Sequence, residues 1–564
     1  MRKDRPTAAA SRRLLAGLIA AAVCGWVALR VLGLETDLAE QAYCLACMAC
    51  AAALLGVASG RAAFGLYAGS LLLGVIWLAS ALKVSYLHEP LLAPDLRYFG
   101  GTFTLEVIGH YPGMLRKSLI AMLGGGTLAV LLWRLESPGL WQARRWRRRL
   151  GMSLLATLPL AASLSPHGPF APLYAAPTWE YISNGARNPI STFIRSFTRM
   201  GIELPARSNP VDPSQWRLAT PALATAAAPD IVVVLEESTL DPQQWADCTS
   251  AHCRSELLQP DATTRALGAL RTHTWGGGTW TSEFALLTGL PHNVFGAAGI
   301  YAPFNLVPRL ADSLPRQLKR LGYHTIAIYP MAGDFVGAAG AYRDYGFDEF
   351  HDSTELGLRW GSTDDELFER AQALYAARRA ANEGPLFMMI LTMRQHGPHD
   401  YPLSALPPPW NEPPAPRLDE RSNRNLATYL YRLHQSALAL AQLRRFLFAG
   451  DRHALLMHFG DHHPSFDGLE LSLRRRQADG ADALYNTYYR IDANFATPAW
   501  HAPRVLDLAF LASVALQLAQ LPPDRYFQAN TRLRERCDGL FEGCPPAVLE
   551  PYFGYILDQL HLLQ

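Results

Sequence analysis

The sequence carries almost no net charge and, beyond about residue 165, no long apolar run. Its 564 residues include 51 Lys and Arg against 49 Asp and Glu, a formal net charge of +2. Without a basic excess, nothing favours nucleic acid as a partner. The later part lacks the ~20 consecutive apolar residues of a membrane-spanning helix. We see no internal repeat, and the length predicts more than one domain.

Before residue 165, five apolar runs of roughly membrane-spanning length follow one another. They cover residues 14–34, 41–59, 63–87, 118–133 and 150–165. Core helices of a soluble protein would explain one such run, but five in succession predict a transmembrane domain over residues 1–165. The first run is too long for a cleavable signal and others follow it, so we expect it to remain as an anchor.

Basic residues predict the orientation of these spans. The N-terminal stretch contains Arg2, Lys3, Arg5, Arg12 and Arg13. The loop before the fifth run reads "QARRWRRRL", whereas the loop between the first two runs, "ETDLAE", is acidic. Basic loops stay in the cytoplasm, and an odd number of spans then exports the rest of the chain. In a bacterium this is a multi-pass inner-membrane protein with a periplasmic or other extracytoplasmic domain.

The cysteines agree with export. Of the eight, four lie in the apolar runs, where we expect them to pack as small side chains. The others form two close pairs, Cys248/Cys253 and Cys537/Cys544, and an oxidising compartment would let each pair close a short loop. The stretch "CTSAHC" also allows a metal site with His252. A disulfide is favoured because no second cysteine pair lies nearby in sequence.

The exported part begins with a connector rich in Pro, Ala and Ser at residues 166–228. Its segment "NPISTFIRSFTRM" is either an amphipathic helix on the membrane surface or an ordinary linker helix. A catalytic domain is expected over residues 229–520. A C-terminal cap that carries the last cysteine pair is expected over residues 521–564.

Short apolar runs alternate with helical stretches from Asp230 onward. The runs "IVVVLE", "HTIAIY", "LFMMILT" and "ALLMHF" are typical of strands buried on both faces. Helices are expected at residues 309–321, 365–382, 423–449 and 504–519, and "LPPPWNEPPAPRL" at a surface loop. This alternation predicts an α/β domain with a mostly parallel sheet.

Residues suited to metal binding stand where these strands end, the edge at which α/β sheets bind ligands. The ends carry Glu237, Asp461 with His462, and His396 with His399. A carboxylate, an Asp-His pair and a threonine hydroxyl suit a divalent metal. Taken singly, Glu237 could cap a helix, Asp461 could begin a turn, and His396 could hydrogen-bond a loop. Their joint placement favours a site.

The stretch "GGGTWTSEFALLTGL" supplies the threonine. A helix N-terminus attracts phosphate, and glycines before it let a phosphorylated group approach the backbone. Thr279 then lies where its hydroxyl touches both a metal and a substrate phosphorus, which would make it a nucleophile. The alternative is a helix N-cap at Thr279 or Thr281. Capping by Thr281 is compatible with catalysis by Thr279.

These motifs resemble the membrane-anchored branch of the alkaline phosphatase/sulfatase superfamily. The sequence is most similar to lipoteichoic acid synthases and to the phosphoglycerol transferases of periplasmic glucans. Phosphoethanolamine transferases resemble it more distantly. The resemblance covers the five-span layout and most of residues 230–500. It is carried by "IVVVLEES", "GGTWTSEFALLTGLP", "LTMRQHGPHDYP", "FGDHHPSF" and "YNTYYRIDANF".

The resemblance implies a role for each matching residue. Glu237, Asp461 and His462 match the metal ligands, and Thr279 matches the nucleophile, which also contacts the metal. His396 matches the histidine that contacts substrate phosphate. One divalent metal is implied: manganese or magnesium as in the glycerol-phosphate enzymes, or zinc as in the ethanolamine enzymes.

The implied reaction has two steps. Thr279 attacks a membrane phospholipid, and the phospho-alcohol then passes to a cell-envelope glycan. The family's aromatic-arginine substrate pair is not clearly present here. Phe335, Tyr342 and Arg343 are loose substitutes for it, and His399 is a further candidate for substrate contact. Glycines beside the nucleophile, and Asn486 near the position of a later histidine ligand, favour one metal and the glycerol-phosphate side.

Three alternatives remain open. The first is phosphoethanolamine transfer by the same site. The second is a hydrolase that uses water as the acceptor; a true sulfatase is disfavoured, because "TWTSE" lacks the C/S-x-P-x-R arrangement. The third is an inactive membrane partner of a polysaccharide export complex.

Overall fold

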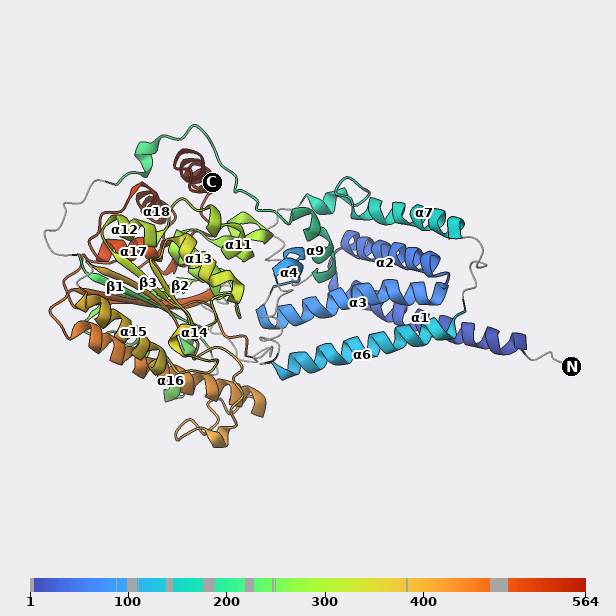
Figure 1. Ribbon diagram of the computed structural model, residues 1–564, viewed down its shortest axis with the longest axis horizontal. Coiled ribbons are helices and arrows are strands. Elements are labelled where there is room, and N and C mark those ends of the chain that lie inside the picture. The colour runs from blue at the N-terminus through green and yellow to red at the C-terminus, as the bar shows by residue number, and fades with distance from the viewer. Residues whose placement is uncertain are drawn as a thin grey trace. The chain divides into compact units, whose positions relative to one another are not determined.

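The computed structural model describes residues 5–87, 89–98, 109, 111–137, 146–175, 188–218, 228–245, 248, 250–381, 384–466 and 485–564. Arg2, Lys3 and the start of the basic loop at residues 142–145 lie outside these ranges. The chain divides into two compact units, Met1–Gly201 and Ile202–Gln564, which Figure 1 shows in blue-green and in green to red. The segment expected as a connector, residues 166–228, is therefore shared between the two units.

The first unit is helical, as the apolar runs predict. Its helices are α1 (Arg5–Leu34), α2 (Leu38–Ser59), α3 (Ala62–Leu87), α4 (Ala93–Tyr98), α6 (Pro112–Leu135), α7 (Trp146–Leu164) and α9 (Pro189–Ser196). Four of them, α1, α2, α3 and α6, are long and apolar enough to cross a membrane, and α7 contains a shorter apolar segment. The expected helical membrane domain is confirmed, with a span count of about five.

Small residues allow α2 and α3 to pack closely. A Cβ added to Gly65 would lie 2.3 Å from the Cα of Gly56, and one added to Gly69 would lie 2.5 Å from the nitrogen of Ala52. Such contacts between small residues are typical of helices that pack inside a bilayer. Helix α9, in the segment expected to form a surface or linker helix, packs within this unit: Ile190 is buried, and Ser191 donates a hydrogen bond to Glu35.

The second unit is built on a mostly parallel sheet. In the described residues it has eight strands in the order β4-β3-β5-β1-β6-β7-β2-β8, and only β7 runs antiparallel to its neighbours. The strands are β1 (Asp230–Glu236), β2 (Thr264–Arg271), β3 (His324–Ile328), β4 (Glu349–His351), β5 (Leu386–Leu391), β6 (Ala454–Gly460), β7 (Asn486–Ala493) and β8 (Val505–Asp507). The four predicted strands are β1, β3, β5 and β6, so the predicted α/β domain is confirmed.

Helices cover both faces of the sheet (Figure 1). Alternate residues of β1 enter two separate cores: Val232 and Val234 lie in one, and Val233 and Leu235 in the other. Helices α15 (Asp364–Ala380) and α16 (Glu420–Phe448) pack in the first core. The other core takes α10 (Thr279–Thr288), α12 (Leu314–Arg320), α13 (Ala338–Tyr345), α17 (Leu511–Leu518), α18 (Arg525–Arg536) and α19 (Pro546–Phe553). Two short helices, α11 (Ala302–Asn305) and α14 (Ser353–Leu356), complete the unit.

One expectation about the end of the chain needs correction. The helix expected over residues 504–519 is wrong in its first part, because Val505–Asp507 pairs with β2 as β8 and the helix begins at Leu511. The tail beyond residue 521, which is expected to form a cap, contributes side chains to the core. Phe527 and Tyr552 are fully buried in the core beside the sheet.

Candidate active site

The first acidic ligand candidate stands just past the end of β1. Glu237 is buried, and its backbone N–H donates to Thr392 Oγ1 at 3.1 Å. The chain then turns at Ser238, whose φ of 50° is unusual for a residue with a side chain. This turn lets the Ser238 N–H donate to Asp461 Oδ1 at 2.7 Å, while its hydroxyl donates to Glu237 Oε1 at 2.8 Å.

The sheet register explains why Glu237 and Asp461 meet. Strands β1 and β6 are parallel neighbours, and Glu236 pairs with Gly460 at the last rung of the ladder. The next residue of each strand is the acidic one, so two carboxylates 224 positions apart in the sequence leave the sheet side by side. Both side chains are buried.

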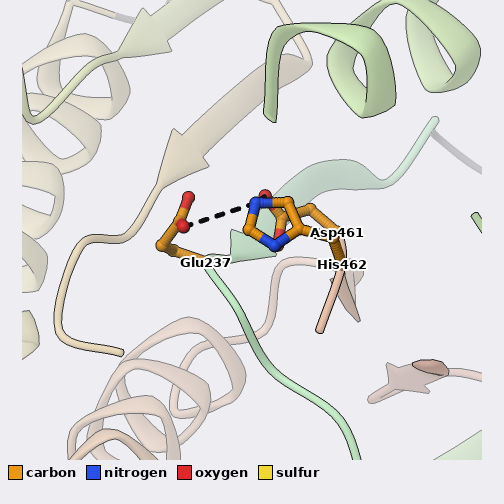
Figure 2. Close-up of side chains that lie close together, drawn as sticks. All are labelled: Glu237, Asp461 and His462. Atoms are coloured by element: carbon orange, nitrogen blue, oxygen red, sulfur yellow. Dashed lines mark ion pairs between the residues drawn. The ribbon is translucent and has the colours of Figure 1, made fainter. Parts of the chain in front are cut away.

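Glu237, Asp461 and His462 converge on one point (Figure 2). One ligand atom from each lies within 4.8 Å of the other two. His462 Nε2 is 3.5 Å from Glu237 Oε1 and 3.2 Å from Asp461 Oδ2. His462 Nδ1 lies 2.9 Å from the carbonyl oxygen of His463, to which it donates. In the neutral ring, the Nε2 lone pair therefore faces the carboxylates, which is the orientation of a metal ligand.

The donor set fits a divalent cation. Asp461 Oδ2 is buried and accepts no hydrogen bond among the described residues. Burial and the charge of Glu237 raise the pKa of Asp461 well above its ordinary value. Two buried carboxylates and an imidazole lone pair aimed at the same point are costly unless a positive charge compensates them. Oxygen and nitrogen donors of this kind suit Mn²⁺, Mg²⁺ and Zn²⁺.

Thr279 completes the cluster from the N-terminus of α10. Its hydroxyl donates to Glu237 Oε2 at 2.8 Å and lies 3.3 Å from His462 Nε2. The N-cap of α10 is Gly278, with φ 83°. Neither threonine therefore caps this helix, as the alternative interpretation of the stretch required; Thr281 instead donates its hydroxyl to the Gly278 carbonyl at 2.8 Å.

His396 follows β5, and its ring interacts electrostatically with Glu237. Burial raises the pKa of Glu237. His462, His396 and the hydrogen bonds from Thr279 and Ser238 lower it by more than burial raises it, so the pKa lies below its ordinary value. The His396 ring meets the Trp360 ring edge-on, with 4.8 Å between centroids. The imidazole is partly exposed, and its Nδ1 lies 2.9 Å from the carbonyl oxygen of Gly397.

The remaining predicted substrate residues lie in varied settings. Arg343 is exposed on α13, Phe335 is partly buried before this helix, and Tyr342 is buried in the core. His399 is also buried, with its Nε2 2.8 Å from the carbonyl oxygen of Gln395. Its ring packs against aromatic neighbours.

The four cysteines of the second unit form two disulfide bonds in the structure. Disulfide bonds join Cys248 to Cys253 and Cys537 to Cys544. The Cys248 and Cys253 sulfurs are bonded to each other, so neither is a thiolate ligand for a metal at "CTSAHC". The His252 ring instead packs against the ring of Trp410, with 4.7 Å between centroids.

Comparison with known families identifies the α/β domain. Residues 229–499 match the sulfatase family. This part of the chain is a sulfatase-family domain. The family is metal-dependent, which agrees with the convergence of Glu237, Asp461 and His462 at the carboxyl edge of the domain's sheet.

Two relatives and two solved structures are similar to this chain. A Haemophilus influenzae protein described as uncharacterized is 28% identical over 511 residues, 84% of this chain and 86% of that protein. A putative cyclic beta-1,2-glucan modification protein of Rhizobium meliloti is 27% identical over 245 residues, 42% of this chain but only 36% of that protein. The Streptococcus pyogenes phosphoglycerol transferase GacH, solved with sn-glycerol-1-phosphate, shares the fold: its TM-score is 0.50 at 16% identity, over 64% of this chain and 99% of GacH. A lipooligosaccharide phosphoethanolamine transferase of Neisseria meningitidis is also among the similar structures, at 13% identity over 83% of this chain and 90% of that chain, with a TM-score of 0.47.

The sequence interpretation missed two residues that orient the cluster. Ser238 bonds both carboxylates, and Thr392 accepts the N–H of Glu237. Both are small hydroxyl residues at or next to predicted strand ends. That position is the one sequence feature that could have identified them as part of the site. Their contacts depend on the backbone turn at Ser238 and on the pairing of β1 with β5, which the sequence pattern does not specify.

Proposed function

We propose that this protein transfers phosphoglycerol, or a similar phospho-alcohol, from a membrane phospholipid to a cell-envelope glycan through a phospho-threonine intermediate. The observation that carries the proposal is the position of Thr279: its oxygen lies 2.8 Å from Glu237 Oε2 and 3.3 Å from His462 Nε2, at a helix N-terminus. Phosphodiester transfer needs a hydroxyl nucleophile beside a centre that compensates phosphate charge.

In the first step, the Thr279 oxygen attacks the phosphorus of the lipid, and the bond between phosphorus and the diacylglycerol oxygen breaks. The hydroxyl proton of Thr279 passes to Glu237 Oε2, which already accepts it in a hydrogen bond, and Glu237 returns it through solvent to the leaving diacylglycerol oxygen. In the second step, a sugar hydroxyl attacks the same phosphorus, the bond to Thr279 breaks, and the proton of the sugar hydroxyl passes through solvent to the Thr279 oxygen.

The chain's own residues position these steps. Glu237, Asp461, His462 and the Thr279 oxygen would hold one divalent metal, Mn²⁺ or Mg²⁺ before Zn²⁺. When bound, such a metal lowers the pKa of a hydroxyl and offsets phosphate charge. His396 would donate a hydrogen bond to a phosphate oxygen, and the positive end of α10 would face the same charge.

The membrane helices and the basic loops support a setting at the bacterial inner membrane, with the sulfatase domain on the extracytoplasmic side. The two disulfides support an oxidising compartment for this domain. A membrane anchor keeps the active site near its lipid donor and raises the effective concentration of that donor.

The test uses the full-length protein with phospholipid labelled in its head group and with an envelope glycan as acceptor. We expect label on the glycan, loss of this transfer in Thr279→Ala, and little change in Thr281→Ala, which alters the same helical turn. Undiminished transfer by Thr279→Ala would rule out the nucleophile. Release of label without any glycan labelling would instead identify a hydrolase that uses water as the acceptor.

A further inference from the structure

The turn that places both acidic ligand candidates is in contact with a tyrosine of α16. The hydroxyl of Tyr429 donates to the Ser238 carbonyl at 3.0 Å and accepts the backbone N–H of Leu240 at 3.3 Å. Ser238 is the residue whose N–H and hydroxyl bond Asp461 and Glu237. One tyrosine oxygen therefore joins two peptide groups of the turn that orients the carboxylates.

This turn needs support from outside the cluster. The φ of Ser238 is 50°, in the left-handed region that a residue with a Cβ enters only at a cost. Such a conformation persists where the surrounding contacts hold it. Ser238 bonds Glu237 and Asp461, but these two carboxyl groups interact unfavourably, since the charge of Glu237 raises the pKa of Asp461. Burial raises the pKa of the Tyr429 hydroxyl above its ordinary value, so this group stays protonated and able to donate.

The ring of Tyr429 is fixed by its own packing. The side chain is fully buried, and its ring centroid lies 5.7 Å from that of Trp245, 5.6 Å from that of His399 and 5.5 Å from that of Phe466. A phenylalanine would keep these ring contacts, because it lacks only the hydroxyl. The packing role and the hydrogen-bonding role of this side chain can therefore be tested separately.

We propose that Tyr429 is a positioning residue for the metal centre: its hydroxyl holds the Ser238 turn in the conformation in which Glu237 and Asp461 share one divalent cation. The inference rests on the metal centre of the proposed function, and it holds whichever phospho-alcohol is transferred. Without the hydroxyl, the turn relaxes toward an ordinary backbone conformation, and the two carboxylates are no longer oriented before the metal binds. Metal affinity then depends on a side chain that is not itself a ligand.

The experiment titrates MnCl₂ into metal-depleted full-length protein in detergent and measures binding by calorimetry, without substrate. We expect Tyr429→Phe to raise the Kd for Mn²⁺ about tenfold, the lower end of the range for lost groups that support metal ligands. Transfer activity should return when Mn²⁺ exceeds the new Kd, because every ligand is still present. In a Ser238→Gly background, Tyr429→Phe should have a much smaller effect, because glycine adopts a positive φ without a Cβ penalty.

Tyr375→Phe is the matched control. Tyr375 is a buried tyrosine of α15 whose hydroxyl donates to Asp230 Oδ2 at 2.7 Å, at the opposite end of β1. This variant also loses one buried, hydrogen-bonded hydroxyl, so it should unfold at a lower temperature and keep the wild-type Kd for Mn²⁺.

Three results would overturn the inference. Tyr429→Phe could bind Mn²⁺ as tightly as the wild-type protein, Tyr375→Phe could weaken binding equally, or the effect of Tyr429→Phe could be the same in the Ser238→Gly background. If the wild-type protein itself binds no Mn²⁺, the proposed metal centre fails and the inference fails with it.

Discussion

At the scale of single residues, the site depends on two buried carboxylates that need a shared positive charge. Asp461→Asn removes one of these charges while keeping the shape of the side chain. We expect metal affinity to fall at least about tenfold, the range seen when groups that support a metal site are lost, and transfer to fall with it. Metal content of the purified full-length protein and its manganese-dependent activity measure both effects.

Asp451→Asn is the control for this change, because Asp451 is exposed. It should bind metal and transfer like the wild-type protein. If Asp461→Asn keeps full metal content and activity, Asp461 is not a ligand and the proposed centre is wrong.

The sequence predicts that four reactive side chains meet, because each is of a suitable chemical type and stands at a suitable place. They are Glu237, Thr279, Asp461 and His462. Each stands at a predicted strand end or helix start, and the resemblance to known motifs fixes which of them act together. The contacts that orient them could not be predicted. Ser238 reaches both carboxylates only because its φ is 50°, and a serine within "LEEST" gives no sign of that conformation.

At the scale of secondary-structure elements, the start of α10 positions the nucleophile. Gly278 has a φ of 83°, and a Cβ added there would lie 2.9 Å from Thr274 Oγ1. Gly278→Ala should therefore cost about 1–2 kcal/mol of stability through backbone strain, and it should also displace Thr279 and reduce transfer. Thermal unfolding and transfer activity of the same preparations separate the two effects.

Gly322→Ala is the matched control. Gly322 has a similar φ of 86°, but nothing lies within 4 Å of a Cβ added there. It should lose comparable stability and keep its activity. Equal activity in the two variants would show that the tight turn at Gly278 does not position Thr279.

Hydropathy predicts some of the strands but not others. β1, β3, β5 and β6 are continuous apolar runs and were predicted. β7 was missed as a strand because it contains Arg490 and Asp492, which are buried but bonded to each other at 2.9 Å. β8 has only three residues, too few for any periodic signal, and was predicted as the start of a helix. Paired buried charges and very short strands become visible only once their partners in the sheet are in place.

At the scale of the whole molecule, the second unit contains its own cores and the whole candidate site. We therefore expect residues 202–564 to fold without the membrane helices and to turn over methyl p-nitrophenyl phosphate. Turnover of phosphatidylglycerol in vesicles should be strongly reduced, because the anchor no longer concentrates the site at the bilayer. Circular dichroism, a soluble phosphodiesterase assay and a vesicle assay test the three statements. Equal activity on vesicles with and without the anchor would contradict the proposed role of the helices.

One peptide oxygen joins the two halves of the site. The carbonyl of His463 accepts the N–H of Gly276, which begins the glycine run, and also faces Nδ1 of His462. The protonation pattern of the imidazole is thus set by main chain, which every amino acid possesses. The His463 side chain is buried and its Nε2 donates to the carbonyl oxygen of Asn486 at 2.7 Å, so this side chain also helps to hold the peptide that orients the ligand.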